Sequence, residues 1–119
     1  MIDEICYLLG RLAFVVAVLS IAASGPTAAA EEPLTIAVTI KDHRFSPAEL
    51  HVPQGKPVIL RITNEDPTPE EFDSTALKIE KVIVGGTYGM VRLRPLGPGR
   101  YPFMGEYHSD TAQGVVISE

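Results

Sequence analysis

From Leu34 onward, apolar and polar residues alternate along the chain in short runs that are separated by glycine and proline. A period of two is typical of strands that bury one face, and no long stretch has the period of 3.6 that an amphipathic helix requires. The pattern predicts an all-β sandwich of about seven strands. The expected strands are Leu34–Lys41, two runs within Ala48–Asn64, Lys78–Val84, two runs within Tyr88–Met104, and Gly114–Ser118.

One segment interrupts this pattern. Residues Asn64–Leu77 are acidic and contain two prolines, so we expect a loop here, with one short helical turn around residues 73–78. No internal repeat or second domain is evident.

The first thirty residues have the layout of a secretory signal. An uncharged apolar run, Leu12–Ala23, follows Arg11, and small residues at Ala28 and Ala30 precede Glu31. We therefore expect residues 1–30 to be a signal peptide and residues 31–119 to form the domain. The apolar run is too short to span a bilayer, so no stable membrane insertion is expected after cleavage. An uncleaved anchor is the alternative.

Composition narrows the function classes. The chain has 119 residues and a formal net charge of −5, and its basic residues are scattered rather than clustered, which excludes a nucleic-acid surface. The single cysteine, Cys6, lies in the expected signal. The domain is therefore expected to have neither a disulfide nor a thiolate ligand.

Side chains with metal chemistry occur in two places. Glu70 and Glu71 precede Phe72, and Glu106 and His108 precede the last strand. Because loops at one end of a sandwich meet, carboxylates from the first place are expected to face the imidazole from the second. Such donors suit iron, zinc or cupric ions. Solvated loop carboxylates and an isolated surface histidine are the alternatives.

Other residues are secondary candidates. Met104 offers a soft sulfur donor, although a methionine at the end of a strand more often fills the core. Glu80 is most simply a charge on a strand surface, His43 is structural or exposed, and His51 faces solvent on its strand. No phosphate-binding glycine loop, nucleophile elbow or zincin histidine pair is present, so a hydrolase is not supported.

Two motifs resemble the cupredoxin family. The first is "FSPAELHVPQGKPVILRITNED", Phe45–Asp66, and the second is "PGRYPFMGEYHSDTAQGVVIS", Pro98–Ser118. Together with the strands between them, the resemblance covers Leu34 to Glu119. It implies a cupredoxin-like Greek-key β-sandwich.

The resemblance also implies that the usual copper ligands are replaced. The first histidine corresponds to Glu70, the cysteine to Gly105, the second histidine to His108, and the axial methionine falls near Ala112. A type 1 blue copper centre needs its copper–thiolate bond, so it is not expected here.

The segments "EEFDSTALKIEK" and "GEYHSDTAQG" resemble a cupredoxin subgroup that accompanies bacterial permease-type iron uptake. They are also similar to the cupredoxin domain of imelysin-type iron-uptake proteins. The resemblance implies a periplasmic protein that binds iron or copper and assists ferrous-iron oxidation or delivery to an iron permease. The residues that it favours as ligands are Glu70, Glu71, Glu106 and His108, followed by Glu80, Met104 and His43.

Two alternatives remain. One is a metal-free module that docks on a transporter or a partner oxidase, in which Glu70 and His108 would point apart or an apolar patch would cover that end of the sandwich. The other is an oxidoreductase with copper at a non-blue site. A metal-binding accessory protein is favoured over a stand-alone enzyme.

Overall fold

The computed structural model describes residues 17–18, 20–22, 24–25 and 32–119. The last of these ranges forms nine strands and one short 3-10 helix. In chain order these are β1 (Leu34–Lys41), β2 (Arg44–Ser46), β3 (Glu49–Val52), β4 (Val58–Asn64), β5 (Glu70–Ser74), β6 (Ile79–Ile83), β7 (Tyr88–Leu93), β8 (Gly99–Gly105), η2 (Glu106–His108) and β9 (Gln113–Ser118).

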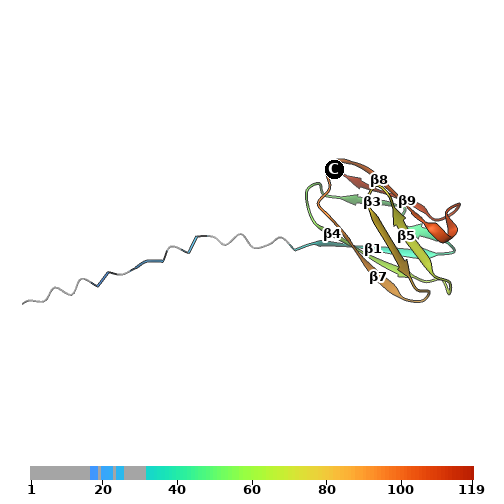
Figure 1. Ribbon diagram of the computed structural model, residues 1–119, viewed down its shortest axis with the longest axis horizontal. Helices are drawn as coiled ribbons and strands as arrows, with labels where there is room; N and C mark the ends of the chain where they lie inside the picture. Colours follow the sequence, from blue (N-terminus) through green and yellow to red (C-terminus); the bar gives the residue numbers. More distant parts are fainter. Residues whose placement is uncertain (1–16, 19, 23, 26–31) are drawn as a thin grey trace, which may run out of the picture.

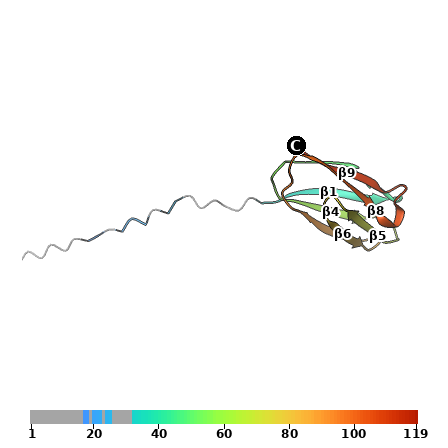
Figure 2. The same ribbon diagram turned by 45° about the horizontal axis from the view of Figure 1, so that its top comes forward.

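The strands form two sheets that pack face to face (Figure 1, Figure 2). One sheet has the order β2-β1-β4-β7 and the other has the order β3-β9-β8-β5-β6. β1 pairs with β4 and β3 pairs with β9 in parallel, and the remaining pairs are antiparallel. Parallel neighbours cannot be joined by a tight hairpin, so the chain passes repeatedly from one sheet to the other.

Alternate positions of each strand face the space between the sheets. On β4 the inward residues Val58, Leu60 and Ile62 are fully buried, as the period-two pattern predicts. Three aromatic rings occupy the core near the η2 end. Phe103 lies 5.0 Å from Phe45 and 4.9 Å from Phe72 between ring centroids. Such pairs add about 0.5–1.5 kcal/mol each beyond their area burial.

Two strands were not predicted, and the expected helical turn around residues 73–78 was wrong. Residues 70–74 form β5 and residues 75–78 form a non-helical turn. The inward positions of β5 are Glu70, Phe72 and Ser74. Two of these three buried side chains are polar, so the strand shows no alternation of apolar and polar residues in the sequence. The other added strand, β2, has only three residues. The all-β sandwich itself is confirmed.

The expected signal peptide, residues 1–30, and Cys6 within it lie outside the described residues, apart from short stretches between residues 17 and 25. Where the chain is described, no helix has the length and apolar character that a membrane span requires.

Candidate functional site

The candidate residues lie at one end of the sandwich but on two sides of β5. Glu70 points into the domain and Glu71 points out, because successive side chains of a strand alternate. We call Glu70 and His108 the buried pair. We call the exposed and half-exposed carboxylates on the outer face of the five-stranded sheet the outer carboxylate cluster: Glu71, Asp73, Glu80 and Glu106.

In the buried pair, one oxygen of Glu70 contacts the imidazole directly. Oε2 lies 2.5 Å from Nδ1 of His108, and the Glu70 side chain is 2% exposed. A hydrogen bond joins the two side chains, and His108 is its donor whenever Glu70 is ionised, because a carboxylate only accepts. The expectation that the two loops meet is therefore confirmed for these two residues.

The second oxygen of Glu70 accepts hydrogen bonds from the backbone. Oε1 lies 3.0 Å from the amide nitrogen of Glu71 and 3.0 Å from that of Tyr107. Glu70 thus connects β5 to η2, and both oxygens of its buried carboxyl group have hydrogen-bond partners. A buried carboxylate without such donors would be strongly destabilising.

His43 joins the buried pair from the turn between β1 and β2. Its ring stacks on that of His108, with centroids 3.5 Å apart and planes inclined by 13°. Asp42 and His43 both adopt left-handed backbone angles, with φ of 50° and 55°. This conformation is uncommon for residues other than glycine and needs support from its surroundings.

Asp66 provides that support, and sequence reasoning missed it. Its carboxylate oxygens accept hydrogen bonds from the amides of Asp42 at 2.8 Å and His43 at 3.0 Å. The bond from the His43 amide is the main cause that lowers the pKa of Asp66, against the opposing effect of burial. The available signal was the sequence Asn64-Glu65-Asp66, because the amide of Asp66 bonds to Oδ1 of Asn64 in an Asx-type turn.

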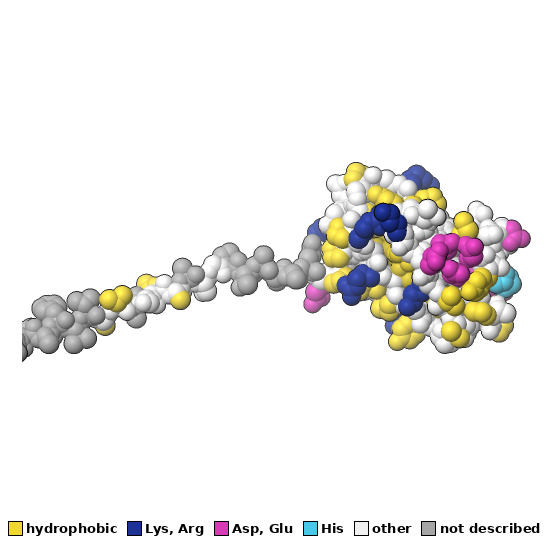
Figure 3. Space-filling model, viewed as in Figure 1, with side chains coloured by type: hydrophobic (Ala, Val, Ile, Leu, Met, Phe, Trp, Pro, Cys, Tyr) yellow, Lys and Arg dark blue, Asp and Glu magenta, His cyan; other side chains and the backbone are white. Residues whose placement is uncertain are grey.

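The outer carboxylate cluster is built from two paired strands and the start of η2. Asp73 on β5 lies directly opposite Glu80 on β6, and Glu71 occupies the same face of β5 two residues earlier. Glu106 follows β8. Figure 3 shows acidic side chains gathered on this face of the domain.

Like charges in the cluster act on Glu106. A side-chain hydrogen bond with Asp73 raises the pKa of Glu106, and repulsion by Asp73, partial desolvation and repulsion by Glu71 and Glu80 raise it further. A proton or a cation at this position would relieve the repulsion. Asp73 was missed from the sequence because β5 was not recognised as a strand, and the alternation with Glu71 was the signal.

Met104 lies on β8 opposite Asp73 and is 41% exposed. It does not fill the core, contrary to the more common fate of such a methionine. Glu71, Glu80, Glu106 and Met104, all candidates from the sequence, therefore share one face. His51 is exposed at the far end of its strand, as expected, and contacts Glu119 there.

The residues that the resemblance pairs with the four copper ligands do not fit a type 1 copper ion. Gly105, which it pairs with the cysteine, is buried against Glu70 and Ala112. A Cβ atom there would lie 2.6 Å from Cδ of Glu70 and 2.7 Å from Cβ of Ala112. The carboxyl group of Glu70 thus occupies the space that a side chain at position 105 would need.

Within the described range, no group of three or more histidine, cysteine, aspartate or glutamate side chains is already arranged to hold a metal ion. The structure brings Glu70 together with His108, and Glu71 together with Glu106. It does not bring all four around one point. Their role as ligands stays a prediction.

Comparison with known proteins assigns the chain to a family. The sequence profile described as "Cupredoxin-like domain" matches residues 11–118. A Rickettsia prowazekii (strain Madrid E) protein, "Uncharacterized protein RP394", is 40% identical over 94 residues, which cover 79% of this chain and 75% of the relative.

Solved structures share the fold at low sequence identity. The copper-loaded metal binding domain of the Streptococcus pneumoniae D39 Cu(I) exporting P-type ATPase CopA has a TM-score of 0.65 and 17% identity, with 76% of this chain and 91% of that chain covered. Auracyanin A, a "blue" copper protein from Chloroflexus aurantiacus, has a TM-score of 0.64 and 17% identity, with 74% and 100% covered.

Proposed function

The chain belongs to the cupredoxin-like domain family, and on that premise we propose that it binds an iron or copper ion at the outer carboxylate cluster. Two proteins that share its fold are described as copper proteins. A likeness at this level of identity shows the fold alone, so the proposal depends on the chemistry of this chain's own residues.

The observation that carries the proposal is the placement of Glu71, Asp73, Glu80 and Glu106 on one face of the sheet, where their proximity also raises the pKa of Glu106. Four carboxylates on one face repel one another at neutral pH, and a bound cation offsets that repulsion. Oxygen donors suit ferrous, ferric and cupric ions, and they stabilise the ferric state over the ferrous state.

The side chains can reach a common ion after small rearrangements. Directly opposed residues on antiparallel strands have Cβ atoms about 4.5–5.5 Å apart. Asp73 and Glu80 are such a pair, and the exposed side chains of Glu80 and Glu106 can change rotamer without disturbing the core. Met104, opposite Asp73 on β8, supplies a sulfur donor at the edge of the cluster.

In this proposal the buried pair positions the ligands rather than binding the ion. Glu70 accepts hydrogen bonds from the backbone amides of Glu71 and Tyr107. It therefore fixes the backbone of β5 and of η2, the two segments that carry Glu71 and Glu106. His108 holds Glu70 in turn. The pair thereby sets the separation between Glu71 on β5 and Glu106 on η2.

We further propose that the protein works in the periplasm, exported by residues 1–30, as an accessory protein of iron uptake. It would assist ferrous-iron oxidation or hand the ion to an iron permease. Support comes from the resemblance of the segments around Glu70 and His108 to iron-uptake cupredoxins, and from oxygen donors that favour ferric iron.

Titration calorimetry with cupric ion, and with ferrous ion under anaerobic conditions, tests the site. The variant Asp73→Asn/Glu106→Gln should lose at least about tenfold in affinity, which corresponds to about 1.4 kcal/mol. The matched control is Glu49→Gln/Glu119→Gln, which removes the same charge beside His51 and should change affinity little. Wild-type affinity in the cluster variant would end the proposal.

Two further measurements separate the possible roles. If His108→Ala weakens binding more than the cluster variant does, His108 is a ligand and the buried pair is the site. Copper-dependent loss of ferrous iron under oxygen would indicate an oxidoreductase rather than passive binding or delivery.

A metal-free docking module is the second candidate function. Glu70 and His108 contact each other, so the first of the two features expected of this alternative, that they point apart, is not found. An apolar groove beside the outer carboxylate cluster nevertheless favours an interaction role.

A further inference from the structure

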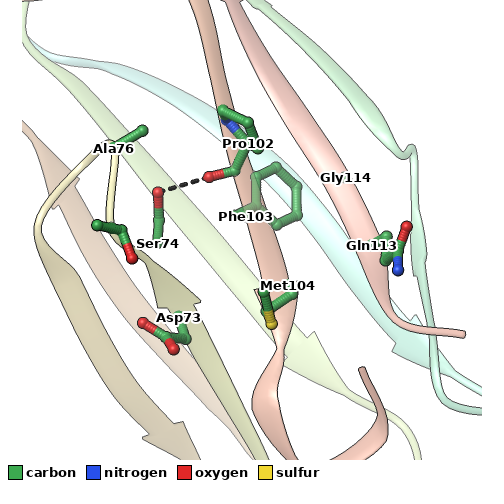
Figure 4. A pocket seen from close by; sticks show the side chains of 9 residues that line it. Asp73, Ser74, Ala76, Pro102, Phe103, Met104, Gln113 and Gly114 are labelled. Carbon is green, nitrogen blue, oxygen red and sulfur yellow. Dashed lines mark hydrogen bonds between the residues drawn. The ribbon is translucent and has the colours of Figure 1, made fainter. Parts of the chain in front are cut away.

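A groove of about 600 Å³ runs along the outer face of the five-stranded sheet, between β5 and the β8–β9 pair. Figure 4 shows Pro102 and Met104 along one side and Ser74 and Ala76 across from them. Most of its lining is apolar. The groove is formed mainly by Asp73, Ser74, Ala76, Pro102, Met104 and Gln113.

The groove forms where the pairing between β5 and β8 ends. The pairing of β5 with β8 includes only Phe72 with Gly105 and Asp73 with Met104. Beyond that point the Ser74 hydroxyl donates a hydrogen bond of 2.7 Å to the carbonyl of Pro102, as Figure 4 shows. Proline has no amide hydrogen to continue a ladder, so the two strands separate.

The groove has charge at one end. Asp73 belongs both to its lining and to the outer carboxylate cluster, so the apolar floor leads directly into four acidic side chains. Met104 lies at the junction and is 41% exposed. A flexible thioether adapts to the shape of different apolar partners.

We propose that this groove docks a segment of a partner protein that presents an apolar side chain beside a lysine or arginine. The apolar side chain enters between Ala76 and Pro102, and in the metal-free protein the basic group lies against Asp73 and the neighbouring carboxylates. Charge complementarity sets the orientation and speeds association.

A stable interface buries about 800 Å² on each partner, which is more surface than a single groove of this kind provides. A volume of about 600 Å³ lies in the range of pockets that hold a drug-sized molecule, so it accommodates a short segment of a partner. We therefore expect the contact to be weak and short-lived.

Two peptides and a metal chelator test the proposal. The probe has phenylalanine between two lysines, and its matched control has phenylalanine between two glutamates. Each is titrated into the isotope-labelled protein in EDTA, and backbone amide shifts are followed by NMR. We expect the lysine peptide to bind with a dissociation constant near 1 mM, about −4 kcal/mol, and to shift amides of residues 73–76, 103–104 and 113–114.

Variants locate the binding. Met104→Lys and Thr75→Lys, both at exposed positions along the groove, should each weaken the lysine peptide at least fivefold. The matched control Met90→Lys alters a methionine of similar exposure, 46%, on the other sheet and should have no effect. Amide dispersion in each spectrum shows that the variant is folded.

Three results would overturn the proposal: equal binding of the glutamate peptide, shifts centred away from the groove, or unchanged binding by both groove variants. The experiment contains no free metal ion. Its failure would therefore leave the proposed metal site standing, and failure of the metal titrations would leave the docking result standing.

Discussion

Glu70 and His108 lie 38 positions apart in the sequence, yet Oε2 of one approaches Nδ1 of the other to 2.5 Å inside the domain. The resemblance to cupredoxins described above pairs both positions with histidine ligands. In this chain the two side chains are hydrogen-bonded to each other. Glu70 also accepts hydrogen bonds from two backbone amides. Through these bonds and the contact with His108, it connects the start of β5 to η2, the helix that follows β8.

This connection predicts a large effect of truncation at position 70. Glu70→Ala leaves the amides of Glu71 and Tyr107 without an acceptor and creates a cavity, so it should lower the free energy of unfolding by about 2–4 kcal/mol. Glu70→Gln keeps one carbonyl acceptor and should cost about 1–2 kcal/mol. Urea denaturation of the three proteins at pH 7 measures both differences.

The control for this prediction is Glu49→Ala, which removes an exposed glutamate that lies near His51. Surface substitutions of this kind usually change stability by less than about 0.5 kcal/mol. Equal, small effects at positions 49 and 70 would show that the contacts of Glu70 contribute little to folding.

Gly105 predicts a coupled effect with Glu70. Gly105→Ala places a Cβ atom 2.6 Å from the Glu70 carboxyl carbon and 2.7 Å from Ala112, which should cost about 1–3 kcal/mol. In the Glu70→Ala background part of that crowding is gone, so the cost of Gly105→Ala should fall by about 1 kcal/mol or more. A double-mutant cycle in urea measures the coupling, and additive effects would contradict it.

The same crowding bears on copper. Gly105→Cys introduces a thiolate at the position that the resemblance pairs with the copper-binding cysteine. Its sulfur would enter space that the Glu70 carboxyl group fills. We expect this single variant to bind cupric ion without the intense blue absorption of a type 1 centre. A blue colour from Gly105→Cys alone would show that Glu70 moves aside readily.

Much of the fold followed from period two, because most strands place apolar residues at alternate positions. β4 is the clearest case, with Val58, Leu60 and Ile62 all inward. β5 did not follow, since its inward positions include Glu70 and Ser74, and a hydrophobic pattern cannot reveal a strand that buries polar groups. Their burial is tolerable only because of partners far away in the sequence.

The candidate site was predictable in part for a related reason. The meeting of Glu70 and His108 followed from the expectation that loops at one end of a sandwich converge. The division between inward Glu70 and outward Glu71 depended on the unrecognised strand. The stacking of His43 depended on the left-handed turn at Asp42 and His43 and on Asp66, which lies more than twenty positions further along the chain. The Asx-type turn at Asn64 was a local signal for Asp66 alone, and it did not indicate which residues Asp66 would contact.

Asp66 predicts a pH-dependent loss of stability. Folding lowers its pKa from the ordinary value of 3.8, so the folded chain binds this proton less tightly than the unfolded chain. The stability that Asp66 contributes is therefore complete above 3.8 and is lost as the pH falls through the lower, folded value. Asp66→Asn should lower the thermal midpoint at pH 7, and the difference from wild type should shrink below pH 3.8.

Asp110→Asn, at an exposed position, serves as the control for Asp66 and should leave the midpoint nearly unchanged. A second readout is the NMR signal of the His108 ring. Losing the Asp66 support should move His43 off that ring and shift the signal. An unaltered His108 signal in Asp66→Asn would show that the turn keeps its shape without the carboxylate.

Glu106 predicts the opposite dependence on pH. Its pKa is raised, first by the hydrogen bond with Asp73, so the folded chain binds this proton more tightly than the unfolded chain does. The associated stability is complete below the ordinary value of 4.5 and is lost as the pH rises through the higher, folded value. Glu106→Gln should therefore raise the thermal midpoint slightly at pH 7, and added salt should reduce the gain by screening.

Asp73→Asn should give a similar gain, and the double variant should gain less than the sum, because each substitution removes the same repulsion. Scanning calorimetry at pH 7 and near pH 4, in chelator to exclude metal ions, measures all three variants. Near pH 4 Glu106, whose pKa is raised above the ordinary 4.5, is largely protonated, so the gain from Glu106→Gln should close. A lower midpoint for Glu106→Gln at pH 7 would show that the cluster stabilises the apo fold, which would remove the electrostatic reason for a cation to bind there.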